Sequence, residues 1–197
     1  MTFDARVSRV DAVTIGASAG GVEALLALLP ALPEDLSASI FVVLHLPRER
    51  PSLLVEIFQP RCLVPVREAQ DKDIVEPGVV YFAPPDYHLL VDAGPQLALS
   101  DDEPVYFSRP SVDVLFESAA EVYGHRMMGI VLTGANHDGA AGLTAVHRAG
   151  GLTVVQRPST ALVPVMAEAA LSRQPADFVL SLDELWHLLH SLKKRTH

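Results

Sequence analysis

The chain has 197 residues, of which 49% are hydrophobic, so it is long enough for one well-packed domain. Its formal net charge of -9 argues against a general nucleic-acid-binding protein, which needs a basic surface to meet phosphate groups. The single cysteine excludes an internal disulfide and a cysteine-rich zinc site. No amino-terminal secretion signal is recognised, and we expect a cytoplasmic protein.

The apolar stretch over 12–32 is about long enough to span a bilayer. Glycines, Ser18 and Pro30 interrupt it, however, and its periodicity changes partway along. We therefore predict a strand over 12–16, a tight turn and then a helix, with no insertion into a membrane. The apolar stripe of that helix is predicted to consist of Val22, Leu25, Leu26 and Leu29.

A second apolar run, 40–44, predicts another buried strand, and a short helix is expected over 53–58. The pattern changes between Val64 and Leu99. Short apolar runs there alternate with turns rich in proline and glycine, a pattern typical of antiparallel hairpins. The runs in question are 79–82, 88–91 and 96–99.

Strands and helices alternate regularly again after this region. Ser111 is predicted to cap a helix that ends at Gly124. A strand over 129–133 then leads to a helix that starts near Asp138 and ends at Gly150–Gly151.

Near the carboxyl end, a strand is expected over 152–156, followed by a helix over 162–172. The sequence Ser181–Glu184 is a capping box that predicts the last helix. The whole pattern predicts an α/β fold, namely a three-layer, doubly wound, mainly parallel sheet of Rossmann-like type with an antiparallel hairpin extension. We expect a single domain over 1–197, with its core at about 11–190.

Three residues that could form a hydrolytic triad each follow a predicted parallel strand. Ser18 follows the first strand, His45 follows the second, and Asp138 comes shortly after the strand over 129–133. In an open α/β sheet the ligand crevice lies outside the carboxyl ends of the strands, so these side chains are predicted to share one edge. Ser18 would attack a carbonyl, His45 would take its proton, and Asp138 would orient the imidazole.

Other interpretations of these residues compete with a triad. A dinucleotide site would need glycine at Ser18 and an acidic residue at His45, and a P-loop would need a Gly-Lys-Ser/Thr sequence that is absent. An α/β-hydrolase has the order Ser, Asp, His, whereas the order here is Ser, His, Asp. Ser18 and Asp138 could also be simple helix caps, and His45 a structural histidine.

The remaining histidines show no metal-ligand spacing on a common face, so we expect no metal and no cofactor. Arginines cluster after His45 in a chain that is otherwise acidic. This cluster is either a solvated face or a means of steering acidic substrates. Under the second hypothesis Arg48 and Arg50 line the approach to the site.

Several motifs together resemble the catalytic domain of chemotaxis-receptor methylesterases of the CheB type, over Val13 to about Leu189. The motifs are Ile15-Gly16-Ala17-Ser18-Ala19-Gly20-Gly21, His45-Leu46-Pro47, Tyr81-Phe82-Ala83-Pro84, Pro110-Ser111-Val112-Asp113-Val114-Leu115-Phe116, Leu132-Thr133-Gly134 and Asp138-Gly139-Ala140-Ala141-Gly142. The resemblance implies hydrolysis of γ-glutamyl methyl esters on receptor signalling helices, with release of methanol, and in some members deamidation of receptor glutamines. It also implies that Ser18, His45 and Asp138 are nucleophile, base and orienting acid.

The resemblance also suggests which residues surround the triad. Ala19, Thr133, Gly134 and Ala135 are expected to form the oxyanion hole or to bind substrate. The family's Thr-Gly-Met-Gly-x-Asp stands here as Thr133-Gly134-Ala135-Asn136-His137-Asp138, so Ala135 keeps a backbone N–H but shrinks the pocket wall. Met166 is expected at the substrate approach, where the family often has Gly-Met-Pro.

The family usually carries a receiver domain, and we expect a stand-alone catalytic domain in which control comes from elsewhere. The implied partners are the cytoplasmic helices of methylated chemoreceptors, in chemotaxis-like, phosphorelay-associated signal transduction. A separate response regulator or other signalling protein is a further partner left open. Two alternative functions also stay open: a catalytically weak or inactive binding module on this fold, and a general hydrolase of small esters.

Overall fold

A computed structural model describes residues 5–46, 52–94 and 96–193 of the chain. Its centre is a parallel sheet of short apolar strands. These are β1 (Ala12–Ala17), β2 (Ser39–Leu44), β3 (Val66–Glu68), β4 (Val80–Phe82), β7 (Met127–Val131), β8 (Leu152–Gln156) and β9 (Phe178–Leu180). In space they follow the order β3-β4-β2-β1-β7-β8-β9. The predicted mainly parallel α/β sheet is confirmed.

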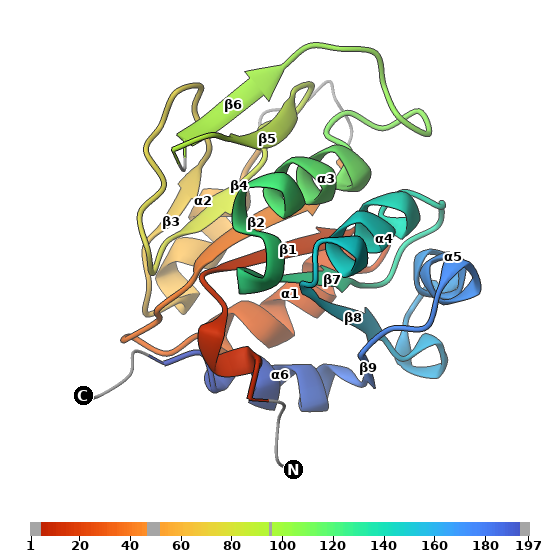
Figure 1. Cartoon of the computed structure of the whole chain (residues 1–197). Helices are drawn as coiled ribbons and strands as arrows, with labels where there is room; N and C mark the ends of the chain where they lie inside the picture. Colours follow the sequence, from red (N-terminus) through yellow and green to blue (C-terminus); the bar gives the residue numbers. More distant parts are fainter. Residues whose placement is uncertain (1–4, 47–51, 95, 194–197) are drawn as a thin grey trace.

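Helices cover both faces of this sheet and produce three layers (Figure 1). They are α1 (Gly21–Leu28), α2 (Leu54–Phe58), α3 (Val112–Tyr123), α4 (Ala140–Arg148), α5 (Val165–Arg173) and α6 (Leu182–His190). α1, α2 and α6 bury their apolar side chains in one core cluster, whereas α3, α4 and α5 pack into the cluster on the opposite face. Because both faces of the central strands are buried, the sequences of these strands are continuous runs of apolar residues without alternation.

The region between Val64 and Leu99 differs in part from the prediction. The expected hairpin strand near 79–82 is β4, which lies inside the main sheet and pairs in parallel with β2 and β3. Only β5 (His88–Asp92) and β6 (Gln96–Ser100) form an antiparallel hairpin in the described part of the chain. β4 is buried along its whole length, which a strand in an exposed hairpin would not be.

Smaller differences concern helix faces and ends. The buried stripe of α1 is Gly21, Ala24, Leu25 and Leu28, so Val22 and Leu26 are only partly buried at its edge. β9 was not predicted, because its three residues are too few to show a period. The capping box at Ser181 is confirmed, with Ser181 Oγ accepting from the N–H of Glu184 and the Glu184 carboxylate accepting from the N–H of Ser181.

The topology places one crevice at the centre of the sheet. The chain runs from β1 toward β3 on one side and returns across β1 to continue with β7, β8 and β9 on the other. The switch in direction therefore lies between β1 and β7, where ligands bind in open α/β sheets. Ser18 leaves the carboxyl end of β1 at this point.

Candidate active site

The turn that carries Ser18 is fixed by its backbone. The N–H of Ser18 donates to the carbonyl of Thr133 (2.9 Å), and the Ser18 carbonyl accepts from the N–H of Gly21 (2.8 Å), where α1 begins. Gly20 has a φ of 78°, and a Cβ at this position would lie 2.8 Å from the Cβ of Leu162. Only glycine satisfies both the left-handed backbone and the close approach. The predicted tight turn between strand and helix is confirmed.

The strand register brings Ser18 beside His45. Ala17, the last residue of β1, is paired with Leu44, the last residue of β2, so the next residue along each strand is Ser18 on one and His45 on the other. Neighbouring strands are about 4.8 Å apart. The N–H of His45 continues the pairing by donating to the carbonyl of Ala17 (3.0 Å). Parallel pairing thus places the serine and the histidine next to one another at the sheet edge.

Asp138 is fully buried in the loop between β7 and α4, and each of its carboxylate oxygens meets two polar hydrogens. Oδ1 accepts from Ser111 Oγ and from the N–H of Asp113, both at 2.9 Å. Oδ2 accepts from the N–H of Val112 (2.7 Å) and lies 2.8 Å from Nε2 of His45. Three of these donors belong to the start of α3, whose positive dipole end stabilises the charge. Asp138 does not cap α4, whose N-cap residue is Gly139.

The contact with Asp138 defines the state of the His45 ring. An ionised carboxylate can only accept, so Nε2 of the neutral imidazole carries the proton and Nδ1 keeps the lone pair. Nδ1 faces the side-chain amide of Asn136, whose Nδ2 lies 3.4 Å away. Asn136 is itself oriented, because its Oδ1 accepts from the N–H of Asp138 (3.1 Å). The lone pair that could act as a base is therefore on Nδ1, where the long contact with Asn136 would have to give way to the Ser18 hydroxyl.

The hydroxyl of Ser18 makes no hydrogen bond to a residue in the described part of the chain, although the side chain is only half-exposed. Hydrogen bonds in unliganded active sites are often long and become short once the substrate is bound. Ser18 thus lies beside His45 without a hydrogen bond to its ring.

Four residues were expected to provide the oxyanion hole or to bind substrate, and the backbone separates them into two pairs. The N–H of Thr133 donates to the side chain of Gln156 (2.9 Å), and the N–H of Gly134 donates to a backbone carbonyl (3.0 Å). Neither N–H is free to serve an oxyanion in this arrangement, so for Thr133 and Gly134 only the expected part in substrate binding stays a prediction. The N–H groups of Ala19 and Ala135 donate to no acceptor among the residues described.

Gly134 and Met166 form the wall beneath the Ser18 turn. A Cβ on Gly134 would lie 1.9 Å from the sulfur of Met166 and 2.9 Å from the Cβ of Ser18. Met166 is 1% exposed and lies in the first turn of α5. Its side chain thus supports the Ser18 turn from below, rather than lining the exposed approach predicted for it.

Asp113 is a site residue that the sequence did not identify. Its Oδ1 accepts from the N–H groups of Gly139 (2.9 Å) and Gly142 (2.6 Å), at the start of α4. Burial raises the pKa of the Asp113 carboxyl from 3.8 to about 6; the Gly142 hydrogen bond lowers it and the charge of Asp138 raises it. An aspartate in a first helical turn is an ordinary feature of helices, so nothing in the sequence marked this one.

The remaining predictions about the site concern cations and membranes. Arg48 and Arg50 lie outside the described residues. Within the described ranges, no group of three His, Cys, Asp or Glu side chains is arranged to hold a metal ion. None of the helices there combines the length and apolar character needed to cross a membrane.

Comparison with known proteins identifies the family. A family model described as CheB methylesterase matches residues 13–189. A relative from Leptospira interrogans is 42% identical over 178 residues, which cover 90% of this chain and 92% of that protein. A protein-glutamate methylesterase/protein-glutamine glutaminase of Anaeromyxobacter dehalogenans is 45% identical over 90% of this chain, which spans 51% of that longer protein.

The fold gives the same result. The crystal structure of the Thermotoga maritima CheB methylesterase catalytic domain superimposes with a TM-score of 0.88. The match covers 93% of this chain and 98% of that one, at 32% sequence identity. The chain belongs to the CheB methylesterase family.

Proposed function

We propose that this chain is a serine esterase that hydrolyses γ-glutamyl methyl esters on chemoreceptor signalling helices, with Ser18, His45 and Asp138 as its triad. The observation that carries the proposal is the His45–Asp138 pair, held by the start of α3 and placed by strand register next to Ser18. A buried carboxylate, an imidazole and an adjacent serine hydroxyl are the groups that acyl transfer requires.

The proposed reaction has two halves. Ser18 Oγ attacks the ester carbonyl while its proton moves to Nδ1 of His45, and Asp138 stabilises the resulting imidazolium through Nε2–H. His45 then gives the proton to the departing methoxide, so that methanol leaves and an acyl-enzyme remains. In the second half, water loses a proton to Nδ1 and attacks the acyl group. Glutamate is released, and the proton returns to Ser18.

The developing oxyanion needs two donors in this scheme. We assign this role to the N–H groups of Ala19 and Ala135, because those of Thr133 and Gly134 are already engaged. Ala19 immediately precedes the left-handed Gly20 and the start of α1, whose dipole favours negative charge. Thr133 supports this loop indirectly, since its hydroxyl donates to the carbonyl of Ala19 (2.8 Å).

The names of the relatives suggest a second reaction, in which ammonia is the leaving group. The Anaeromyxobacter relative is named as a glutaminase as well as a methylesterase. Attack by Ser18 on a glutamine side chain would release ammonia instead of methanol through the same acyl-enzyme. We propose that both reactions take place on the cytoplasmic helices of chemoreceptors. Control by a separate response regulator or another signalling protein stays a prediction.

The first test is the release of methanol from a methylated receptor signalling fragment. We expect release by the wild-type protein and a loss of about three orders of magnitude or more in Ser18→Ala. Ser159→Ala is the matched control, because Ser159 is exposed and lies outside the site. Equal rates in wild type and Ser18→Ala would contradict the proposal.

A serine-reactive phosphonate separates the remaining explanations if the wild-type protein releases no methanol. Labelling that requires Ser18 would show an active triad and point to a different ester, including the small esters of a general hydrolase. No labelling would favour the binding module, in which the fold docks partners without turnover.

A further inference from the structure

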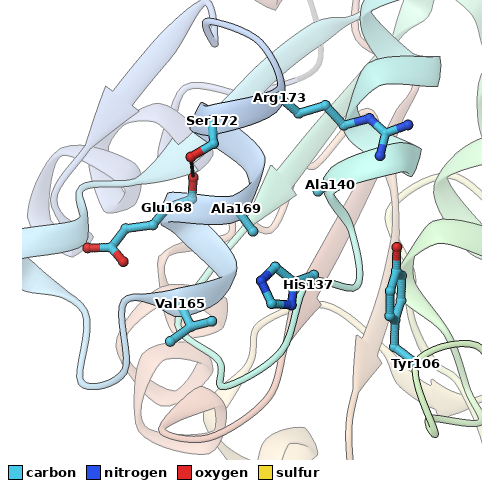
Figure 2. A pocket seen from close by; sticks show the side chains of 8 residues that line it. All are labelled: Tyr106, His137, Ala140, Val165, Glu168, Ala169, Ser172 and Arg173. Atoms are coloured by element: carbon cyan, nitrogen blue, oxygen red, sulfur yellow. Dashed lines mark hydrogen bonds between the residues drawn. The ribbon is translucent and has the colours of Figure 1, made fainter.

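A cavity of about 710 Å³ opens beside the loop between β7 and α4, between α5 and the turn that carries Tyr106 (Figure 2). His137 projects into its centre, and Ala140 at the start of α4 lies on its inner side. His137 directly precedes Asp138 in the chain. The cavity therefore borders the loop that carries Asp138.

One wall of the cavity is a single face of α5. Its lining residues Val165, Ala169 and Arg173 are spaced four residues apart. At a rise of about 1.5 Å per residue, this face is roughly 12 Å long, or about two helical turns. The amino-terminal end of α5 is tied to the segment beside Ser18, because the N–H of Met166 donates to the carbonyl of Gly134 (3.1 Å) and an added Cβ on Gly134 would lie 2.9 Å from the Cβ of Ser18. Val165 therefore marks the end of the groove nearer Ser18, and Arg173 marks the far end.

The opposite wall is held rigidly. Val105 and Ser108 exchange two backbone hydrogen bonds (3.1 and 2.8 Å), and Tyr106, at the corner between them, has a φ of 47°. A left-handed backbone at a bulky residue is strained and persists only where its surroundings hold it. Arg109 helps to hold this turn by donating to the carboxylate of Asp86 (2.8 Å). The turn thus holds the backbone of Tyr106, whose aromatic ring borders the groove.

The far end of the groove is cationic. Arg173 makes no ion pair with a described residue, and its guanidinium extends toward the side of the cavity on which Tyr106 lies (Figure 2). The carboxylate of Glu168 points away from Tyr106 in the same view. Val165, Ala169 and Tyr106 thus give the groove apolar and aromatic side walls, whereas Arg173 offers one positive charge at the far end.

We propose that this groove holds the helix that carries the glutamyl ester, and that Arg173 pairs with a carboxylate about two turns from the ester on that helix. The inference rests on the proposed function, which requires a helical protein substrate with one side chain at Ser18. Residues seven positions apart lie on the same face of a helix and about 10.5 Å apart along it, which matches the length of the groove. A free small ester would leave the groove empty.

The test uses synthetic helical peptides that carry one γ-methyl glutamate. A glutamate or a lysine is placed seven residues from the ester, on the amino-terminal side in one series and on the carboxyl-terminal side in the other. We expect the wild-type protein to prefer the glutamate peptide of one series by about three- to tenfold in kcat/KM, mainly through KM, with less preference at high salt. In Arg173→Glu the preference should reverse to the lysine peptide.

Arg148→Glu is the matched control. Arg148 also lies in the last turn of a helix, and its substitution changes the net charge by the same amount as Arg173→Glu. It should keep the wild-type preference. Ser18-dependent cleavage without any charge preference would overturn the groove assignment and leave the proposed function standing. So would an equal effect of Arg173→Glu and Arg148→Glu. If the wild-type protein cleaves none of these peptides but releases methanol from the receptor fragment, the groove assignment fails alone. If it does neither and Ser18 is not labelled by the phosphonate, the proposed function fails with it.

Discussion

The two oxygens of Asp138 accept two hydrogen bonds each, and all four donors are fixed in position. The donors are Ser111 Oγ, the N–H groups of Val112 and Asp113, and Nε2 of His45. Only a group without polar hydrogens of its own can satisfy all of them. The carboxylate thus orients the imidazole and, at the same time, anchors the start of α3.

Asp138→Asn tests this double role. An amide would direct its own hydrogens at two of the four donors, leave buried N–H groups unsatisfied at about 1–3 kcal/mol each, and favour the wrong His45 tautomer. We expect kcat to fall by about 10⁴ and thermal stability to fall with it. Ser111→Ala removes a single donor and should cost only about 1 kcal/mol of stability while retaining most activity. Equal losses in the two variants would contradict the argument.

α3 and α4 cap one another through exchanged aspartates. Asp138, just before α4, accepts from the start of α3, while Asp113 on α3 accepts from the start of α4. The sequence predicted the cap at Ser111 and the end at Gly124, because those signals are local. It could not show that each helix depends on the carboxylate of the other, since 25 residues separate Asp113 from Asp138.

Gly142→Ala tests how closely these helices must approach. Alanine favours an exposed helix by about 1 kcal/mol over glycine. Here the added Cβ would lie 2.6 Å from the Cβ of Phe116 and 2.9 Å from the backbone of Asp113. The clash should outweigh propensity and destabilise the protein by about 1–3 kcal/mol, as measured by urea unfolding. Ala141→Gly, at the adjacent helical position, should cost only about 1 kcal/mol. An increase in stability for Gly142→Ala would show that α4 can move away from α3.

The sequence correctly predicted the features of the fold that depend on local residue patterns. The strand-and-turn pattern around Ser18 and the apolar run before His45 correctly placed both residues at the ends of parallel strands, whereas only the structure shows that these strands are neighbours. The prediction failed at β4, because a short apolar run between turns looks alike in a hairpin and in a parallel sheet. The occupied N–H groups of Thr133 and Gly134 were equally hidden, since their acceptors come from distant β8 and from the segment before α5.

The buried carboxyl of Asp113 should also make the unfolding free energy of the protein depend on pH. Folding raises the pKa of Asp113 from 3.8 to about 6, mainly through burial, so the folded state holds this proton more tightly than the unfolded state does. The contribution of Asp113 to stability is therefore greatest below pH 4 and is lost as the pH rises from about 4 to 6. A shift of this size corresponds to on the order of 3 kcal/mol.

Asp113→Asn and Asp113→Ala together isolate that contribution. Neither side chain titrates, so the unfolding free energy of each variant, relative to wild type, should rise by up to about 3 kcal/mol between pH 4 and pH 7. The two difference curves should run parallel. Asparagine keeps an acceptor for the N–H groups of Gly139 and Gly142, whereas alanine leaves both unsatisfied, so the alanine curve should lie lower by about 2 kcal/mol or more. Urea unfolding at several pH values measures both curves. If the unfolding free energy of the variants relative to wild type stays constant or falls as the pH rises, the Asp113 carboxyl is ionised in the folded protein without cost.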